Sequence, residues 1–169
     1  MIDETVPRWY AVHTRFKTEK IVVRLLTQKQ IECYVPLQKR YRKHGTKRIV
    51  TELPLLSCYA FVNITKDDYV KVLETEFVLG FVKFAKDIFP IPEEEFNLMR
   101  RIVGEDVEVA VEKYTFYAGD EVEIAQGNLA GIRGKMVEID GKNRVLVELG
   151  HLGYNLQISV DKQQLIKVY

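Results

Sequence analysis

Residues 119–137 read GDEVEIAQGNLAGIRGKMV, a stretch in which two strand-like runs flank a loop rich in glycine. Val122 and Ile124 alternate with acidic neighbours, which predicts a half-buried strand. Gly127 and Gly131 suit the tight loop that follows, because glycine adopts a positive φ without strain. The stretch therefore predicts a hairpin, which by itself could belong to any small β-barrel.

The residues after this hairpin repeat the strand pattern at short intervals. The apolar pairs are Val137/Ile139, Val145/Val147 and Ile158/Val160, followed by residues 165–168, with turns at Asp140-Gly141 and Gly150. Short strands separated by glycine turns are typical of small all-β barrels. We therefore expect five strands between residue 117 and the last residue of the chain.

The first hundred residues have a mixed pattern of strands and helices. We expect strands over residues 8–13, 57–64 and 78–84, helices over 16–29, 66–74 and 92–104, an extended run over 32–43, and a hairpin tip at 44–47 with a return to residue 52. This order predicts an α+β sandwich, with helices on one side of a mostly antiparallel sheet. Residues 105–112 are acidic and lack a helical stripe, which favours a linker there.

Composition and charge exclude several classes of protein. The net charge is +1, and the last 60 residues carry seven basic and eight acidic side chains, so extensive coating of nucleic acid is not indicated. No apolar run approaches the roughly 20 residues that span a membrane, and the first residues lack a signal-peptide pattern, which predicts a cytoplasmic protein. Cys33 and Cys58 are expected to be buried thiols.

Several motifs together resemble the NusG family. Residues 119–137 resemble the KOW motif, and Trp9-Tyr10-Ala11-Val12-His13-Thr14 resembles the start of the NusG N-terminal (NGN) domain. The run LPLLSCYAFV at residues 53–62, Val82-Lys83-Phe84 and the helix start at Ile91-Pro92 also fit that domain. At Leu56-Ser57-Cys58 the chain departs from relatives, which usually carry proline or glycine in this bend.

The resemblance implies a domain organisation and a function. It implies an α+β NGN domain over residues 1–106, a linker over 107–116 and an SH3-like KOW barrel over 117–169. It also implies a transcription elongation or antitermination factor with no catalytic activity and no cofactor. The compact form looks like the specialised paralogues of the RfaH type, which act on long operons such as those for polysaccharide synthesis.

Tyr59 and Phe61 are the first candidate site residues, because alternation along a strand places both on one face. Ala60, Val62 and Ile64 point to the other face, so the strand is either central and covered on both sides or exposes an aromatic patch. The resemblance favours the patch and implies that it contacts RNA polymerase. His13 and Tyr10 in the first strand are expected to border it.

A basic cluster is the second candidate. Between Cys33 and Thr51 there is no acidic residue, while the basic residues are Lys39, Arg40, Arg42, Lys43, Lys47 and Arg48. The cluster either keeps a solvated hairpin soluble or contacts nucleic-acid phosphates, with a base stacked on a tyrosine. The resemblance places this hairpin near non-template DNA on the polymerase, and Arg15 and Lys17 are expected to extend the surface.

The loop of the second domain is the third candidate. We expect Asn128, Leu129, Ala130 and Ile132 to be exposed and to bind a partner, which the resemblance implies is a small-subunit ribosomal protein or the termination factor Rho. Seven glycines and the period-two apolar pattern predict that this domain is permanently β and free on its linker. The protein is expected to be a monomer.

Two alternatives stay open from the residues alone. A ribosome-associated RNA-binding KOW protein is one, although the slightly acidic second half counts against it. An enzyme that uses Cys58 with His13 is the other, and no phosphate loop or nucleophile elbow supports it. The spacing of His13, His44 and His151 relative to the cysteines predicts no metal site.

Overall fold

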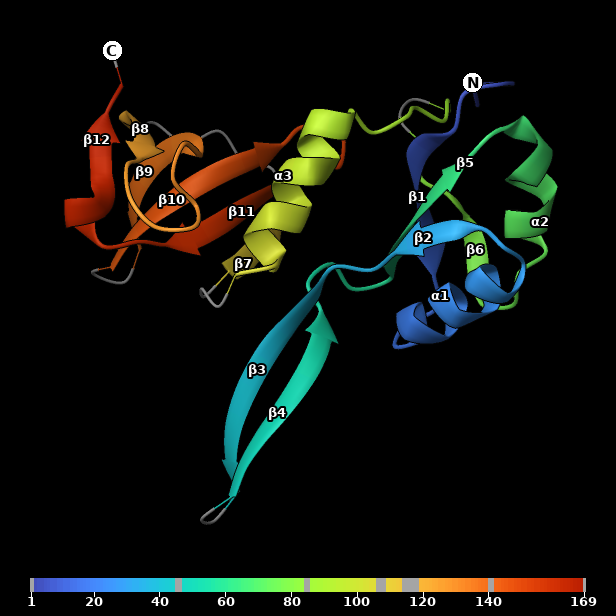
Figure 1. Cartoon of the computed structure of the whole chain (residues 1–169), viewed down its shortest axis with the longest axis horizontal. Helices are drawn as coiled ribbons and strands as arrows, with labels where there is room; N and C mark the ends of the chain where they lie inside the picture. The colour runs from blue at the N-terminus through green and yellow to red at the C-terminus, as the bar shows by residue number, and fades with distance from the viewer. Residues whose placement is uncertain are drawn as a thin grey trace. The chain divides into compact units, whose positions relative to one another are not determined.

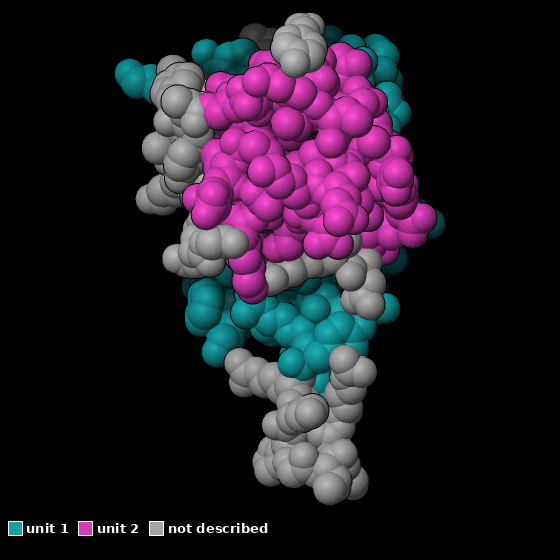
Figure 2. Space-filling view, turned by 90° about the vertical axis from the view of Figure 1, so that its left-hand side faces the viewer, with its two compact units in different colours: residues 1–97 teal, residues 98–169 magenta. Residues whose placement is uncertain are grey.

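The computed structural model describes residues 2–44, 47–83, 86–105, 109–113, 119–139 and 142–168. The side chains of residues 42–44, 47–48, 112–113 and 139 are outside this description. The chain divides into two compact units, residues 1–97 and residues 98–169, which Figure 2 shows in different colours. Each unit has its own main sheet, of four strands in the first and six in the second.

The first unit is an α+β domain built on a four-stranded antiparallel sheet in the order β2-β5-β1-β6 (Figure 1). Its elements are β1 (Arg8–Thr14), α1 (Glu19–Gln28), β2 (Glu32–Tyr34), β3 (Leu37–His44), β4 (Lys47–Pro54), β5 (Tyr59–Ile64), the 3-10 turn η1 (Lys66–Asp68), α2 (Tyr69–Leu73) and β6 (Val78–Phe81). Helix α3 (Glu93–Val103) begins in this unit. The predicted α+β class and the order of elements are confirmed.

One face of this sheet packs on α1 and α2. Alternation along the strands supplies the sheet side of this core, and the helices supply its other side: Tyr10, Val12, Ala60, Val62, Ile64 and Phe81 from the strands, and Val22, Leu26 and Val72 from the helices. Helix α1 begins at Glu19 rather than at the expected Phe16, because Lys17 has a φ of 64°, which no α-helix accommodates. Phe16 is consequently outside the helix and 65% exposed.

The opposite face of the sheet is covered in part by Phe96 of α3. Its ring stacks on Trp9 with centroids 3.8 Å apart, and meets Tyr34 and Phe61 edge-on at 5.5 and 5.8 Å. The expectation that helices lie on one side only is therefore wrong. Both faces of β5 carry apolar side chains, so this strand can be covered on both sides. A strand covered on both sides was one of the two interpretations of its sequence.

The bend before β5 is held by a buried carboxylate. Cys58 has a φ of 66°, a conformation that costs L-residues other than glycine about 1–2 kcal/mol. Its backbone N–H donates to Oε1 of Glu19 at 2.7 Å, and its carbonyl accepts from Thr14 N–H at 2.9 Å. Glu19 is itself buried, so this hydrogen bond ties the bend to the first turn of α1. Cys58 therefore has a backbone conformation that glycine would adopt with least strain. It belongs to the bend at residues 56–58, where this chain departs from the family pattern.

Strands β3 and β4 form a separate two-stranded sheet that extends away from the main sheet (Figure 1). Their register runs from Leu37↔Pro54 to His44↔Lys47, as the predicted hairpin requires, and the tip at residues 45–46 lies outside the described residues. An isolated two-stranded ribbon is marginally stable by itself. Lys20 of α1 anchors its base by donating from Nζ to the carbonyl of Glu52 at 2.9 Å.

The second unit is all-β apart from the end of α3. Its strands are β7 (Val109–Lys113), β8 (Glu121–Ile124), β9 (Arg133–Ile139), β10 (Lys142–Leu149), β11 (Tyr154–Ser159) and β12 (Leu165–Lys167), with the 3-10 turn η2 (Lys162–Gln164) before the last. They form one antiparallel sheet in the order β12-β8-β9-β10-β11-β7. The alternating residues Val122, Ile124, Val145, Val147, Leu156 and Ile158 are buried, which confirms the predicted all-β class.

Strand β7 lies within residues 107–116, where a linker is expected. It pairs with β11, and Val109 and Val111 oppose Ile158 and Leu156. Residues 105–112 have no helical stripe, but Val109 and Val111 follow the period-two pattern of a strand. The described part of the second unit therefore contains the five expected strands, β8 to β12, and β7 in addition. Among the described residues no helix is long and apolar enough to cross a membrane.

Candidate functional site

An aromatic row crosses the first sheet at one end. His13 of β1 pairs with Tyr59 of β5 on one side and with Gly80 of β6 on the other. The rings of His13 and Tyr59 are 4.8 Å apart, and both residues are half-buried. A Cβ added at Gly80 would meet nothing within 4 Å, so no side chain covers His13 from that strand. We call the two rings of His13 and Tyr59, together with the bare Gly80 beside them, the aromatic row.

Phe61 shares the sheet face of the aromatic row but is fully buried. Its ring is covered by Phe96, which also stacks on Trp9. Tyr59 and Phe61 therefore lie on one face, as the alternation predicts, but only Tyr59 is accessible. Phe96 lies in the helix expected over residues 92–104, and no local pattern in the sequence indicates that its ring covers Phe61.

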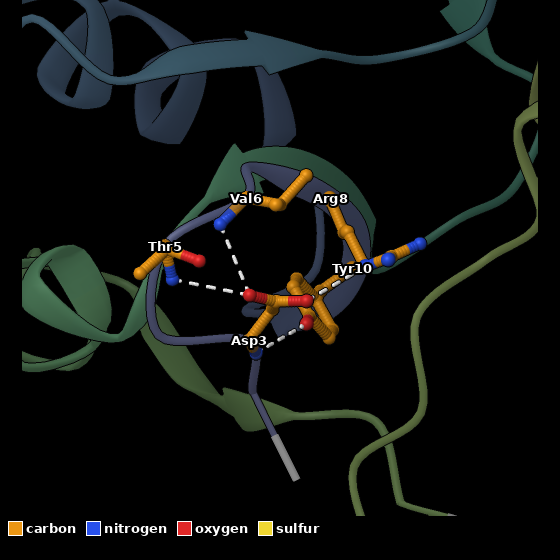
Figure 3. Close-up of polar contacts among 5 residues, drawn as sticks. All are labelled: Asp3, Thr5, Val6, Arg8 and Tyr10. Atoms are coloured by element: carbon orange, nitrogen blue, oxygen red, sulfur yellow. Dashed lines mark hydrogen bonds and ion pairs between the residues drawn. The ribbon is translucent and has the colours of Figure 1, made fainter.

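Tyr10 lies on the opposite face of the sheet, in the core against α1 and α2. Residues 10 and 13 are three apart in one strand, and an odd spacing places side chains on opposite faces. The phenol oxygen of Tyr10 accepts the backbone N–H of Asp3 at 3.1 Å (Figure 3). Tyr10 therefore does not border the aromatic row, and its buried position excludes it from the accessible surface.

Asp3 organises the turn that precedes β1. Its carboxylate accepts the backbone N–H groups of Val6 and Thr5 at 3.0 and 3.1 Å, and Nε of Arg8 at 3.1 Å (Figure 3). These bonds favour the ionised carboxylate and lower the pKa of Asp3 from 3.8 to about 2. The bond from the backbone N–H of Val6 has the largest effect. The turn thereby closes over the hydroxyl end of Tyr10.

A pH prediction follows from the lowered pKa of Asp3. Because the folded pKa is below the unfolded one, the stabilisation is complete above pH 3.8 and is lost as the pH falls towards about 2. We expect the side-chain carboxyl carbon of Asp3 to titrate by NMR with a midpoint near 2. In the Arg8→Gln variant the midpoint should rise yet stay below 3.8, since both backbone bonds are retained. A wild-type midpoint at 3.8 would contradict the hydrogen bonding described.

The basic residues fall into two segments. Arg15 and Lys17 lie exposed in the loop after β1, and Nζ of Lys17 lies 5.1 Å from the ring of Phe16. Lys39 and Arg40 are exposed on β3, opposite Glu52 and Thr51 of β4. The remaining predicted residues, Arg42, Lys43, Lys47 and Arg48, lie on the same hairpin, but their side chains are outside the described residues.

The hairpin also exposes apolar surface among its charges. Tyr41 and Val50 oppose each other across the ribbon and are 45% and 52% exposed. Residues 39 and 41 share one face of β3, so Tyr41 lies beside Lys39. A phenol ring flanked by a cation is an arrangement that can stack on a nucleobase while a phosphate is bound nearby.

The glycine-rich loop of the second unit has the predicted backbone. Gly127 and Gly131 adopt φ values of 84° and 85°, and Gly131 N–H donates to the carbonyl of Ile124 at 2.7 Å. Asn128 is exposed and Ala130 half-buried, but Leu129 and Ile132 are only 5% and 3% exposed. The expectation that all four residues are exposed is therefore wrong, because two apolar side chains of the loop turn inward.

Arg101, in the part of α3 that belongs to the second unit, holds this loop. Its Nη2 donates to the carbonyls of Asn128 and Ala130 at 2.9 and 2.6 Å. The amide of Asn128 in turn donates to Oε2 of Glu105 at 2.8 Å. The loop is thus held by hydrogen bonds within its own unit.

The cysteines are not joined, and the described residues contain no cluster suited to a metal. Cys33 and Cys58 are free thiols and both are half-buried, less than the expected full burial. Burial raises the pKa of the Cys33 thiol. No group of three or more His, Cys, Asp or Glu residues able to hold a metal ion occurs in the described part of the chain.

Comparison with known proteins identifies the family. The family model described as "Transcription termination factor nusG" matches residues 7–100, which is more than half of the chain and includes the aromatic row and the hairpin. The chain belongs to the NusG family. It is therefore a transcription factor of NusG type.

A solved structure of a NusG protein has the same fold. The chain is similar to the structure described as "Domain interaction in Thermotoga maritima NusG", with 22% identity over 96% of this chain and 98% of that chain and a TM-score of 0.62. It also matches the structure described as "MjSpt4:Spt5 complex conformation A", with 20% identity over 95% and 97% of the two chains and a TM-score of 0.34. No curated protein matches the chain significantly.

Proposed function

We propose that this NusG-family chain is a transcription elongation and antitermination factor that binds RNA polymerase through its first unit and recruits a second partner through its second unit. The observation that carries the proposal is the aromatic row, where His13 and Tyr59 are half-exposed beside the bare Gly80. Aromatic side chains on a rigid sheet offer a large contact area at low entropic cost, which suits protein recognition.

The role of Phe61 in polymerase binding is indirect in this proposal. Phe61 is buried beneath Phe96 and lies two residues from Tyr59 on the same face. It supports the strand that presents Tyr59, while Tyr59 and His13 make the contact. His13 and Tyr59 are paired in the β1–β5 ladder, which fixes the backbone that carries both rings, so the surface is preorganised for a partner.

The hairpin is proposed to contact DNA on the polymerase surface, with non-template DNA as the target. Lys39 and Arg40 are exposed, and Tyr41 is positioned to stack on an unpaired base. Arg42, Lys43, Lys47 and Arg48 add positive charge near the tip, and Arg15 and Lys17 are proposed to extend it. This contact would position the factor without requiring a large basic domain.

The loop of the second unit is proposed to recruit either a small-subunit ribosomal protein or the termination factor Rho. Asn128 and Ala130 are its accessible residues, while Leu129 and Ile132 fix its shape from inside. We also propose a cytoplasmic monomer of the specialised RfaH type that acts on long operons such as polysaccharide loci. In functional terms residues 1–106 would bind polymerase, and residues 117–169 would recruit the partner.

The experiment that tests the proposal is in vitro transcription with core RNA polymerase on a template rich in pauses. Addition of the protein is expected to shorten pauses and to increase full-length transcript. A paired reaction with polymerase from the same source and a NusG-family protein of known effect shows that the template responds. An unchanged pause pattern in a reaction whose control responds would argue against the proposed function.

Neutralising the hairpin is predicted to weaken DNA-dependent recruitment. The change is Lys39, Arg40, Arg42 and Lys43 to glutamine, and the matched control changes Lys66, Lys71, Lys83 and Lys86 to glutamine. Substitutions on a protein surface typically change stability by less than about 0.5 kcal/mol each, so we expect both proteins to fold. Each lost phosphate contact lowers the salt slope of binding by about 0.9.

The measurement for this variant is binding to polymerase on duplex and on bubble templates over a series of salt concentrations. We expect the hairpin variant alone to lose the additional affinity for the bubble template and to show a reduced salt slope. Equal behaviour of the two variants on all templates would assign the hairpin charges to solubility.

A further inference from the structure

The loop between β1 and α1 holds the ring of Phe16 at the surface, where it is 65% exposed. Hydrogen bonds fix this loop: the N–H of Arg15 donates to the carbonyl of Phe77 at 3.0 Å, and the N–H and hydroxyl of Thr18 donate to the carbonyl of Arg15 at 3.2 and 2.7 Å. Lys17 has a left-handed φ of 64°, which a residue with a Cβ adopts with strain. Strained backbone of this kind is concentrated at binding sites. The ring is therefore presented by a fixed turn.

The chain around this ring is basic. Residues 15–31 contain five basic side chains and one acidic side chain, Glu19. Glu19 is buried, and its carboxylate accepts the backbone N–H of Cys58 at 2.7 Å, so it faces the bend before β5 rather than the solvent. Two of the five cations, Lys20 and Lys29, donate from Nζ to backbone carbonyls of other elements. Three cations remain for a ligand.

These three cations lie beside the ring or on the helix that follows it. Arg15 and Lys17 are its neighbours in the chain, and Nζ of Lys17 is 5.1 Å from the centre of the Phe16 ring. Arg24 is exposed on the outer side of α1. None of the three forms an ion pair with another residue that the structure describes. The exposed Glu76 precedes the residue that anchors the loop, so the local charge of this surface is positive but not uniform.

An exposed ring between two cations fits a nucleotide better than it fits an apolar pocket. A base stacks on an aromatic face whatever its sequence, and neighbouring cations bind the phosphates of the same strand. A ring that anchors a protein partner is instead surrounded by contacts that exclude water. Because the side chains next to Phe16 in the chain are charged, the nucleotide is favoured.

The loop is also close to the hairpin that is proposed to contact DNA. The first turn of α1 follows the loop directly, and Nζ of Lys20 in that turn donates to the carbonyl of Glu52 at the base of the hairpin. We propose that Phe16 stacks on an unpaired base of single-stranded DNA while Arg15 and Lys17 bind the adjoining phosphates. This inference rests on the proposed function, since the strand would be the one that the hairpin meets.

The test is photocrosslinking of the full-length protein to a ten-residue oligothymidylate with one central 5-iododeoxyuridine, a base that couples on irradiation to an aromatic ring stacked on it. We expect an adduct in the peptide that contains Phe16. In parallel, fluorescence anisotropy of a labelled oligothymidylate measures the affinity. Phe16→Ala and Phe16→Leu are each expected to bind roughly tenfold more weakly than wild type, and Phe16→Tyr like wild type, because only an aromatic ring stacks on a base. Phe89→Ala removes another exposed ring of the same unit and is the matched control.

The outcomes that would overturn the proposal are distinct. Wild-type affinity in Phe16→Ala, an adduct confined to other residues, or no oligonucleotide binding by the wild type would each refute the stacking site. Wild-type affinity in Phe16→Leu would show that the ring does not act by stacking. Unchanged DNA affinity in Phe16→Ala with weaker binding to core polymerase would reassign the ring to a protein contact. DNA binding that depends on Phe16, without any polymerase binding, would leave the site standing and refute the proposed function instead.

Discussion

The Phe96→Ala variant is expected to unfold its first unit at a much lower urea concentration than wild type. Phe96 is buried and touches Trp9, Tyr34 and Phe61. Truncating a buried phenylalanine costs about 3–5 kcal/mol, because transfer energy is lost and a cavity is left. The stacked and edge-on contacts of the Phe96 ring are lost in the same truncation. We therefore expect a destabilisation toward the upper end of this range.

The fluorescence of Trp9 is the direct probe of this change. It is the only tryptophan of the chain and is stacked on Phe96 at 3.8 Å, so its signal reports the first unit. Leu79→Ala is the control, since Leu79 is exposed and its loss should change stability by less than about 0.5 kcal/mol. Similar unfolding midpoints for the two variants would show that Phe96 does not hold the covering face of the sheet.

The Gly134→Ala variant is expected to disrupt the second unit. Gly134 pairs with Val122 in the β8–β9 ladder, and a Cβ there would lie 2.2 Å from the carbonyl oxygen of Leu146 and 2.8 Å from Cγ1 of Val145. The nearest atom is backbone of the neighbouring strand β10, which cannot move without breaking the ladder. Overpacking of this kind typically costs about 1–3 kcal/mol or more.

Gly150→Ala provides a control in the same unit, in the turn after β10. The nearest atom to its added Cβ would be Oε1 of Glu148 at 3.4 Å, the movable end of an exposed side chain. Thermal unfolding followed by far-ultraviolet circular dichroism should show a lower transition for the Gly134 variant only. Amide hydrogen exchange in β9 and β10 locates the loss, and equal protection in both variants would argue against the tight strand approach at Gly134.

The fold could be predicted largely because its local signals agree. The alternation at Val122/Ile124 and Val145/Val147 and the glycine pair at residues 127 and 131 each indicate the same β structure. Strand β7 was not predicted, because residues 105–112 were tested only for a helical stripe, although Val109 and Val111 alternate as in the strand that pairs with β11. Pairing partners distant in the chain are a tertiary property, so no local pattern of these residues could reveal them.

The candidate site could be predicted only in part. Alternation correctly placed Tyr59 and Phe61 on one face, but which of the two is accessible depends on Phe96, more than thirty residues later in the chain. Tyr10 could have been excluded from sequence alone, since an odd spacing from His13 puts it on the other face. The inward position of Leu129 and Ile132 could not be inferred, because a loop residue's direction follows from the backbone turn.

The central claim is that the accessible aromatics His13 and Tyr59 bind RNA polymerase. Its most direct measurement is the affinity of core polymerase for wild type, for His13→Ala/Tyr59→Ala and for the exposed-residue control Val70→Ala/Leu73→Ala. Removing aromatic anchors at the centre of an interface costs about 2–4 kcal/mol, so we expect the aromatic variant to bind at least about thirtyfold more weakly. Unfolding followed by Trp9 fluorescence verifies that all three proteins are folded. Wild-type affinity in a folded aromatic variant would contradict the claim.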